Sequence, residues 1–188
     1  MNTIAQSIGG AAVTTKLAMR MEDSLQAFAV RAACFIGELD VPYSEEFDGH
    51  DFGATHVIAY VGDEPVGTVR LRWFQSFAMP ERLAVIQRFR GHHIGELLLE
   101  RCRTLAAGRG CNMLYVQTLP GDVAYWEKHG WRRLVAEEAA SGAKRIVAMV
   151  KAVDPSKPLP EVEAPESVVL RPEPQLDAAG VPLGIASN

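Results

Sequence analysis

The sequence has few cysteines, and their spacing forms no pattern. The three cysteines, Cys34, Cys102 and Cys111, are an odd number at wide intervals. Disulfide frameworks use even numbers of cysteines, and zinc sites use closely spaced pairs. We therefore expect reduced, partly buried thiols and a cytoplasmic protein.

Long hydrophobic runs and an excess of positive charge are also missing. No stretch approaches the ~20 consecutive apolar residues that a membrane-spanning helix needs. Residues 1–12 lack the basic segment and apolar run of a secretory signal. The net charge of -4 at pH 7 gives no broad basic face for the phosphates of a nucleic acid. We expect neither a membrane nor a nucleic acid as a partner.

Proline is concentrated at the end of the chain. Seven of the 11 prolines lie between residues 155 and 182 of this 188-residue sequence, with almost no amphipathic period around them. Such a segment buries too little apolar surface to order itself alone. The expected organisation is one domain over residues 1–153 and a Pro-rich C-terminal tail or arm over residues 154–188. The tail is either disordered or an extended arm. The arm would lie on this subunit or on a neighbouring one, and an arm on a neighbour implies a homodimer.

Hydrophobic periodicity predicts an α/β domain before the tail. Strands are expected over residues 16–21, 56–61, 65–73, 82–86, 113–118, 131–135 and 145–150. Helices are expected over residues 23–39, 94–108 and 122–129. Antiparallel hairpins open and close this order, and a strand–helix–strand segment lies between them. The expected fold is a single α/β domain with a mixed, mostly antiparallel central sheet flanked by helices.

The most informative stretch is the turn Arg90-Gly91-His92-His93-Ile94-Gly95 between an expected strand and a long helix. A turn of this kind exposes backbone N–H groups at a helix start, where the macrodipole favours anions. Gly91 and Gly95 allow a pyrophosphate to approach the backbone closely, and Arg90 adds a planar cation. The alternative is a surface turn followed by a packing glycine. A dinucleotide-binding fingerprint fits less well, because its third glycine is missing and hairpins precede the turn.

The adjacent residues His92 and His93 also suggest a metal site. Neighbouring residues rarely bind one ion, and no third ligand is close in the sequence. We expect no metal ion, and we interpret the two histidines as phosphate neighbours or helix-start residues.

Three motifs in this order resemble the GNAT superfamily of N-acetyltransferases. Residues 81–95 look like its motif A, whose loop usually reads Arg/Gln-x-x-Gly-x-Gly/Ala, although His93 stands where the middle glycine is usual. Residues 31–51 and the hairpin after them are similar to the ElaA-like branch. The sequence Tyr-Trp-Glu-Lys-His-Gly-Trp at 125–131 looks like the family's closing Phe-Tyr-Glu-Lys-x-Gly-Phe. The resemblance covers roughly residues 16–151.

The resemblance implies acetyl-CoA as cofactor, a splayed central sheet, and acetyl transfer to a primary amine by direct attack in a ternary complex. It implies that the backbone amides of Leu83, Ala84 and Val85 bind the pantetheine arm and polarise the thioester carbonyl. It also implies a group of pyrophosphate-binding residues, namely Arg90, Gly91, His92, His93, Ile94 and Gly95.

The resemblance implies less about the catalytic acid and base. Glu81 is the candidate base, and the alternative is an ion-paired or solvated glutamate. The tyrosine that usually protonates the leaving thiolate is replaced by Trp126, whose indole is no acid. Tyr125 lies one residue earlier, about 100° away around a helix. Tyr125 is either the acid or a packing residue, and water, Tyr115 or Tyr43 are the other donors.

The acidic loop after the first expected helix carries Asp48 and Asp51, with Glu45 and Glu46, and Glu38 is a further expected acceptor-binding residue. The family places acceptor-binding elements here, and an acidic rim attracts a cationic amine. The alternative is a solvated loop. Small-molecule amines and peptide amines both remain open as substrates. Two competing functions are a CoA-binding protein with a degenerate active site, which the missing tyrosine favours, and another nucleotide-binding module.

Overall fold

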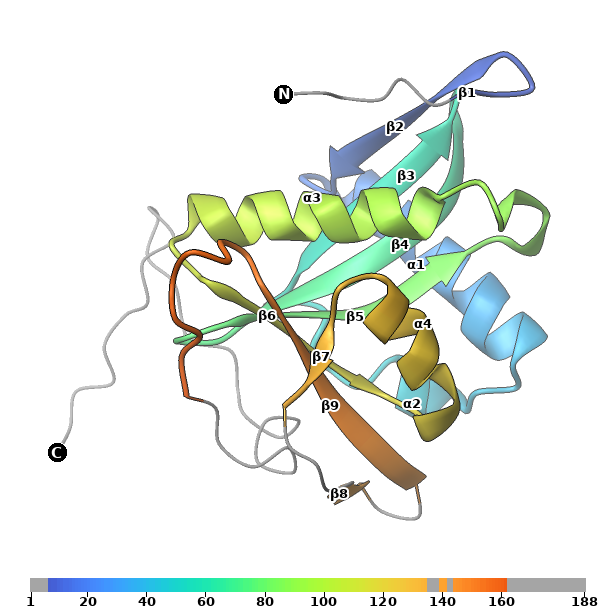
Figure 1. Cartoon of the computed structure of the whole chain (residues 1–188). Coiled ribbons are helices and arrows are strands. Elements are labelled where there is room, and N and C mark those ends of the chain that lie inside the picture. The colour runs from blue at the N-terminus through green and yellow to red at the C-terminus, as the bar shows by residue number, and fades with distance from the viewer. Residues whose placement is uncertain (1–6, 135–138, 142–143, 162–188) are drawn as a thin grey trace, which may run out of the picture. The chain divides into compact units, whose positions relative to one another are not determined.

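The computed structural model of the chain describes residues 7–134, 139–141 and 144–161 (Figure 1). The chain divides into two compact units. Unit 1 comprises Met1–Leu71 and Pro80–Cys102, and unit 2 comprises Arg72–Met79 and Arg103–Asn188.

The sheet of unit 1 is built from consecutive antiparallel strands. They are β1 (Ser7–Ile8), β2 (Ala11–Leu17), β3 (Thr55–Val61) and β4 (Glu64–Trp73). In the strand order β4 is followed by β5 (Ala78–Val85). The β3–β4 connection has two residues and begins at Gly62 with a φ of 60°, a backbone conformation that glycine adopts without strain. The predicted hairpin is confirmed.

The first long strand lies earlier than the sequence indicated. We expected it over residues 16–21, whereas β2 covers Ala11–Leu17 and pairs with β3 from Val13↔Val61 to Leu17↔Val57. Side-chain exposure alternates along β2, but its small residues give this alternation a weak hydrophobic signal.

The first helix begins before the expected cap at Asp23. Helix α1 (Met21–Arg31) has Asp23 in its first turn, where its carboxylate accepts the N–H groups of Met19 (3.1 Å) and Arg20 (3.2 Å). A side chain that binds these amides stabilises the helix start. A hydrogen bond from Lys16 lowers the pKa of Asp23 to about 2. After Arg31 the chain continues as a π-helix, η1 (Ala32–Glu38), and α2 (Tyr43–Glu46) follows within the expected acidic loop.

Helix α3 (Ile94–Gly108) confirms the predicted helix, and its beginning packs on β4. Ile94 and Leu98 are buried. A Cβ atom at Gly67 of β4 would lie 3.0 Å from Ile94 Cγ2 and 3.3 Å from Leu98 Cδ1. Glycine at position 67 therefore lets the start of α3 approach the strand closely. This packing fixes the loop that precedes the helix.

Unit 2 contains a second antiparallel group of strands. Strand β6 (Met113–Thr118) pairs with β9 (Lys144–Ala152), and β7 (Arg132–Arg133) and β8 (Ala139–Ser141) also pair with β9. Strand β6 is parallel to β5, with Ala78 opposite Leu114. Helix α4 (Val123–Lys128) follows the 3₁₀ turn η3 (Pro120–Asp122). The core of this unit consists of Phe74, Phe77, Met79, Met113, Tyr115, Ala148 and Val150.

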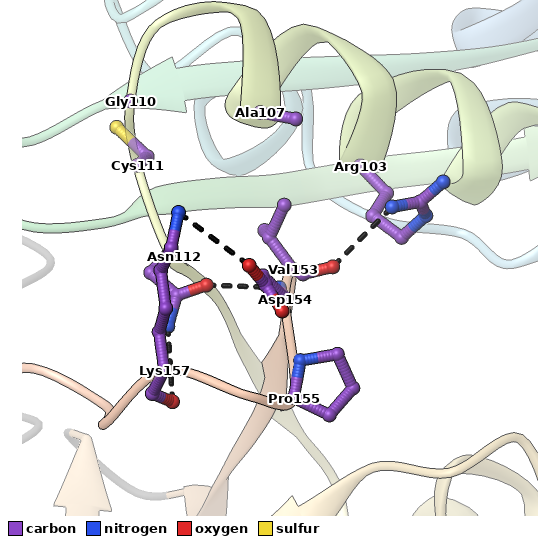
Figure 2. A pocket seen from close by; sticks show the side chains of 9 residues that line it. All are labelled: Arg103, Ala107, Gly110, Cys111, Asn112, Val153, Asp154, Pro155 and Lys157. Atoms are coloured by element: carbon purple, nitrogen blue, oxygen red, sulfur yellow. Dashed lines mark hydrogen bonds and ion pairs between the residues drawn. The ribbon is translucent and has the colours of Figure 1, made fainter.

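The segment after β9 is attached to unit 2 (Figure 2). Asn112 accepts the N–H of Asp154 at 2.8 Å and donates to the carbonyls of Lys157 (3.3 Å) and Pro158 (3.0 Å). Leu159 packs against the core of unit 2. The first residues of the expected tail are thus ordered, and residues 162–188 lie outside the described residues.

The predicted fold class is confirmed as an α/β fold with a mixed, mostly antiparallel sheet. Among the described residues, no helix has the length and apolar character that crossing a membrane requires.

Candidate functional site

The loop that precedes α3 contains two residues in the left-handed region. After β5 the chain forms the 3₁₀ turn η2 (Gln87–Phe89), and the N–H of Arg90 bonds to Gln87 O at 3.2 Å. Gly91 has a φ of 81° and His93 a φ of 56°. The position that the family motif gives to glycine therefore has the conformation that favours glycine. Histidine is among the residues that adopt it more often than most.

The start of α3 presents backbone donors. The first hydrogen bond of the helix joins Leu97 N to His93 O at 3.1 Å, so the N–H groups of Ile94, Gly95 and Glu96 precede the helical ladder. They lie at the positive end of the helix dipole, which favours an anion. His93 and Glu96 form an exposed pair, with Nδ1 3.2 Å from Oε1. The described residues contain no group of three or more histidine, cysteine or acidic side chains arranged for a metal ion.

Arg90 is held between the end of β5 and the π-helix. Its Nε donates to Val85 O at 2.9 Å, and its Nη2 donates to Glu38 Oε2. The hydrogen bond with Glu38 is the main reason why the pKa of Arg90 is raised. About half of the Arg90 side chain, 47%, remains exposed. The guanidinium is therefore a fixed cation that solvent reaches.

Strand β5 contains an irregular residue just before the amides expected to bind pantetheine. Arg82 has a φ of 52°, a left-handed conformation that costs of order 1–3 kcal/mol for a residue other than glycine. Its Nη2 donates to Glu45 O (2.5 Å) and to Asp48 Oδ2 (3.0 Å). Its Nε lies 3.1 Å from Glu46 Oε2, an ion pair that lacks hydrogen-bond geometry. These contacts stabilise the local change in backbone direction ahead of residues 83–85.

Beside β5 lies a group of charged side chains that we call the arginine–carboxylate cluster. Its members are Arg31, Glu46, Asp48, Asp51, Arg70, Glu81 and Arg82. The side chains of Arg31, Arg70 and Glu46 are fully buried. Three arginines face four carboxylates, which leaves one negative charge in excess. All members belong to unit 1.

Arg70 is the centre of this cluster. Its two terminal nitrogens donate to the two carboxylate oxygens of Asp48, both at 2.7 Å, and Nη1 also donates to Asp51 at 3.2 Å. Its Nε donates to Glu81 Oε2 at 3.1 Å, and Nη2 contacts the same oxygen. Burial raises the pKa of Asp48, but the hydrogen bonds and charge of Arg70 outweigh it, so this pKa is well below the usual range. Two expected site residues, Glu81 and Asp48, therefore meet at one guanidinium.

Arg31 anchors the opposite side of the cluster. Its Nε donates to Glu46 Oε1 at 2.5 Å, its Nη2 donates to Glu46 O at 2.8 Å, and its Nη1 donates to Asp51. The guanidinium lies over the rings of Phe28 (5.5 Å) and Phe47 (5.3 Å), so cation–π contacts add to the ion pairs. The pKa of Asp51 is lowered, because its bonds to Arg31 outweigh the effect of burial.

His56 borders the cluster as a buried side chain. Its Nε2 lies 3.1 Å from Asp51 O, and its Nδ1 has no hydrogen-bond partner among the described residues. Burial lowers the pKa of His56, and the neighbouring arginines act in the same direction, against the opposing effect of Asp51.

The sequence did not predict Arg31, Arg70 and Arg82 as partners of the expected acidic residues. The available signal was two arginines, Arg70 and Arg72, inside an otherwise apolar strand, because a charge in a buried strand requires a partner. The structure places Asp48, Asp51 and Glu81 together. Glu38, which was expected beside the aspartates, instead binds Arg90.

In unit 2, Trp126 takes part in packing and hydrogen bonding. Its indole N–H donates to Thr118 Oγ1 at 2.9 Å, and its ring lies 5.0 Å from that of Trp131. The neighbouring Tyr125 is 42% exposed, and its ring contacts His129. Tyr115 is fully buried, and burial raises its pKa. Of the tyrosines in unit 2, Tyr125 is the one exposed to solvent.

Comparisons with known proteins agree with this description. Residues 24–131 match the Acetyltransferase (GNAT) family. The chain is 30% identical over 122 residues to YjcF of Bacillus subtilis (strain 168), named an uncharacterized N-acetyltransferase, and the match covers 65% of this chain and 87% of YjcF. Among solved structures, a protein from Lactobacillus plantarum described as a "putative N-acetyltransferase" has a TM-score of 0.69 at 23% identity, covering 75% of this chain and 98% of that chain. Escherichia coli ElaA has a TM-score of 0.63 at 17% identity, covering 74% and 99%. The two structural likenesses concern the fold alone.

Proposed function

The chain belongs to the GNAT acetyltransferase family, and from this premise we propose that it transfers an acetyl group from acetyl-CoA to a primary amine. The amine attacks the thioester directly in a ternary complex, so no covalent enzyme nucleophile is needed. The observation that supports the proposal is the loop before α3, where two left-handed residues lead to the free amides of a helix start and Arg90 is a fixed, half-exposed cation.

The donor set of this loop suits a pyrophosphate. Backbone N–H groups of Ile94, Gly95 and Glu96 would bind one phosphate at the helix start, and Arg90 would bind the other with its planar donors. Gly91, His92 and His93 shape the turn around them. The residues present therefore fit the CoA pyrophosphate.

The end of β5 provides the second part of the cofactor site. Among the described residues, β5 pairs with β6 at Ala78 and Leu114, near the start of β5. This position supports the proposal that the amides of Leu83, Ala84 and Val85 bind the pantetheine arm and the thioester carbonyl. Acetyl-CoA supplies the acyl group and the thiolate leaving group. Fixed amides near the carbonyl would stabilise the negative charge that develops on its oxygen.

Glu81 is the proposed acceptor of the amine proton, directly or through one water. Its carboxylate is 14% exposed and is oriented by Arg70. Asp48 is 26% exposed and Asp51 is 12% exposed, so we propose Asp48 as the residue that attracts the ammonium form of the acceptor. Both small-molecule and peptide amines fit this description.

The test of this proposal is release of free CoA from acetyl-CoA across a panel of small and peptide amines. We expect turnover with at least one amine class and a kcat about 100- to 10,000-fold lower in Glu81→Gln, which keeps the shape but removes the base. Glu64→Gln is the matched control, because its carboxylate forms an exposed pair with Arg88. Equal kcat values in Glu81→Gln and wild type would assign Glu81 to structure alone.

A second candidate function is CoA binding without transfer. It is favoured by Trp126, which replaces the usual tyrosine and whose N–H is bound to Thr118. In that case CoA binds, but no amine in the panel releases free CoA.

A further inference from the structure

Glu38 forms an ion pair with Arg90, the cation that the proposed cofactor site requires. Its Oε2 accepts a hydrogen bond from Arg90 Nη2, while Arg90 Nε binds Val85 O. The side chains of Glu38 and Arg90 are 26% and 47% exposed. The pair is therefore accessible to a ligand.

Packing keeps Glu38 in this place. The π-helix η1 lies against the end of β5, because its Cys34 forms a buried apolar cluster with Ala84 of β5 and with Val30 of the preceding helix α1. Arg90 also interacts with the Cys34 thiol, four residues before Glu38. Glu38 is thus carried by a helix that is fixed to the strand whose last carbonyl binds Arg90.

A carboxylate and a phosphate use the same planar N–H donors of a guanidinium. A phosphate that approaches Arg90 therefore meets a cation whose charge is already balanced, and a carboxylate left beside it repels it. We propose that Glu38 sets the affinity of the cofactor site by competing with a cofactor phosphate for Arg90. This inference rests on the proposed function, because it assumes that the loop before α3 binds CoA. It assigns to Glu38 a role toward the cofactor in place of the expected role toward the acceptor.

The proposed competition predicts that a substitution of Glu38 which removes its charge raises the affinity for CoA. Glu38→Gln keeps the length of the side chain and an oxygen acceptor but removes the negative charge. Exposed ion pairs contribute up to about 1 kcal/mol, so removing the competitor should tighten CoA binding by about 2- to 5-fold. A residue that merely positions Arg90 would have the opposite effect, because its loss would leave Arg90 less well placed.

The experiment is isothermal titration of CoA into the full-length wild type, Glu38→Gln, Arg90→Ala and the double variant. We expect tighter binding in Glu38→Gln and no effect of Glu38→Gln in the Arg90→Ala background, since the competition acts through Arg90. Glu64→Gln removes the same charge from the pair with Arg88, two residues before Arg90, and should leave affinity unchanged.

Each outcome of this titration is decisive. If wild type binds CoA and Glu38→Gln binds equally or more weakly, the inference fails and the proposed function stands. The inference also fails if Glu64→Gln tightens binding as much, because the effect is then one of net charge. If neither wild type nor Glu38→Gln binds CoA, the proposed function fails and the inference fails with it.

Discussion

At the scale of single residues, the loop before α3 has His93 at the position where the family motif has glycine. The backbone here is left-handed with a φ of 56°. Histidine tolerates this conformation, whereas a β-branched residue would be an outlier. Histidine at this position is therefore compatible with the left-handed backbone. The sequence identified the position as a departure from the motif, but the conformation that glycine serves became visible in the structure.

His56 and the neighbouring aspartates are expected to make the stability of the fold depend on pH. The folded-state pKa values of His56, Asp48 and Asp51 are all lowered. The unfolded chain therefore binds protons more readily, and the stability that these groups contribute is present above their unfolded pKa values and is lost as pH falls. The loss begins below about 6.5 for His56 and below about 3.8 for the aspartates.

We predict that the melting temperature of the wild type falls between pH 7 and pH 5 and falls further below pH 4. One titrating group contributes at most about 1.4 kcal/mol per pH unit. His56→Gln should flatten the upper part of this profile and leave the lower part. His92→Gln, at an exposed position, is the control that should leave both parts unchanged. Parallel profiles for wild type and His56→Gln between pH 7 and pH 5 would show that His56 does not carry this dependence.

At the scale of elements, strong hydrophobic periodicity predicted helices and strands, whereas the ion pairs between elements could not be predicted from the sequence. The helix 94–108 and the strand 113–118 have the predicted bounds, because their apolar stripes are long and uninterrupted. The change from α1 to a π-helix at Ala32 has no such signal. The arginine–carboxylate cluster also escaped prediction, since Arg31, Arg70 and Glu81 come from three elements that meet in the folded chain.

The segment that follows β9 allows an element-scale prediction. Asn112 is hydrogen bonded to Asp154 and Lys157 (Figure 2) and to Pro158. Leu159 packs on the core of unit 2. Net hydrogen bonds contribute about 0.5–1.5 kcal/mol each. Removal of residues 154–188 should therefore destabilise the protein by about 2–4 kcal/mol, and removal of residues 162–188 should cost less.

Calorimetry of the two truncated chains measures this difference, and light scattering on the same samples gives their oligomeric state. Equal melting temperatures for the two truncations would contradict the role assigned to residues 154–161. Conversion of a dimer to a monomer by removal of residues 162–188 would identify the tail as an arm between subunits.

At the scale of the whole molecule, the family match and the fold agree with each other. The family match spans residues 24–131, and the fold is that of solved acetyltransferases. Three ordered motifs were enough to predict this from the sequence. The acceptor could not be predicted, because the sequence does not show which carboxylates remain accessible after pairing with arginines.

The most direct test of the account is the affinity for CoA of wild type, Arg90→Ala and Arg88→Ala, measured by isothermal titration calorimetry. Arg88 lies two residues before Arg90 and is the matched control, since its side chain forms an exposed ion pair with Glu64. The account predicts that wild type and Arg88→Ala bind CoA alike and that Arg90→Ala binds at least about fivefold more weakly. Equal affinity in Arg90→Ala and wild type, with both proteins folded, would contradict the assignment of the loop before α3 as the pyrophosphate site.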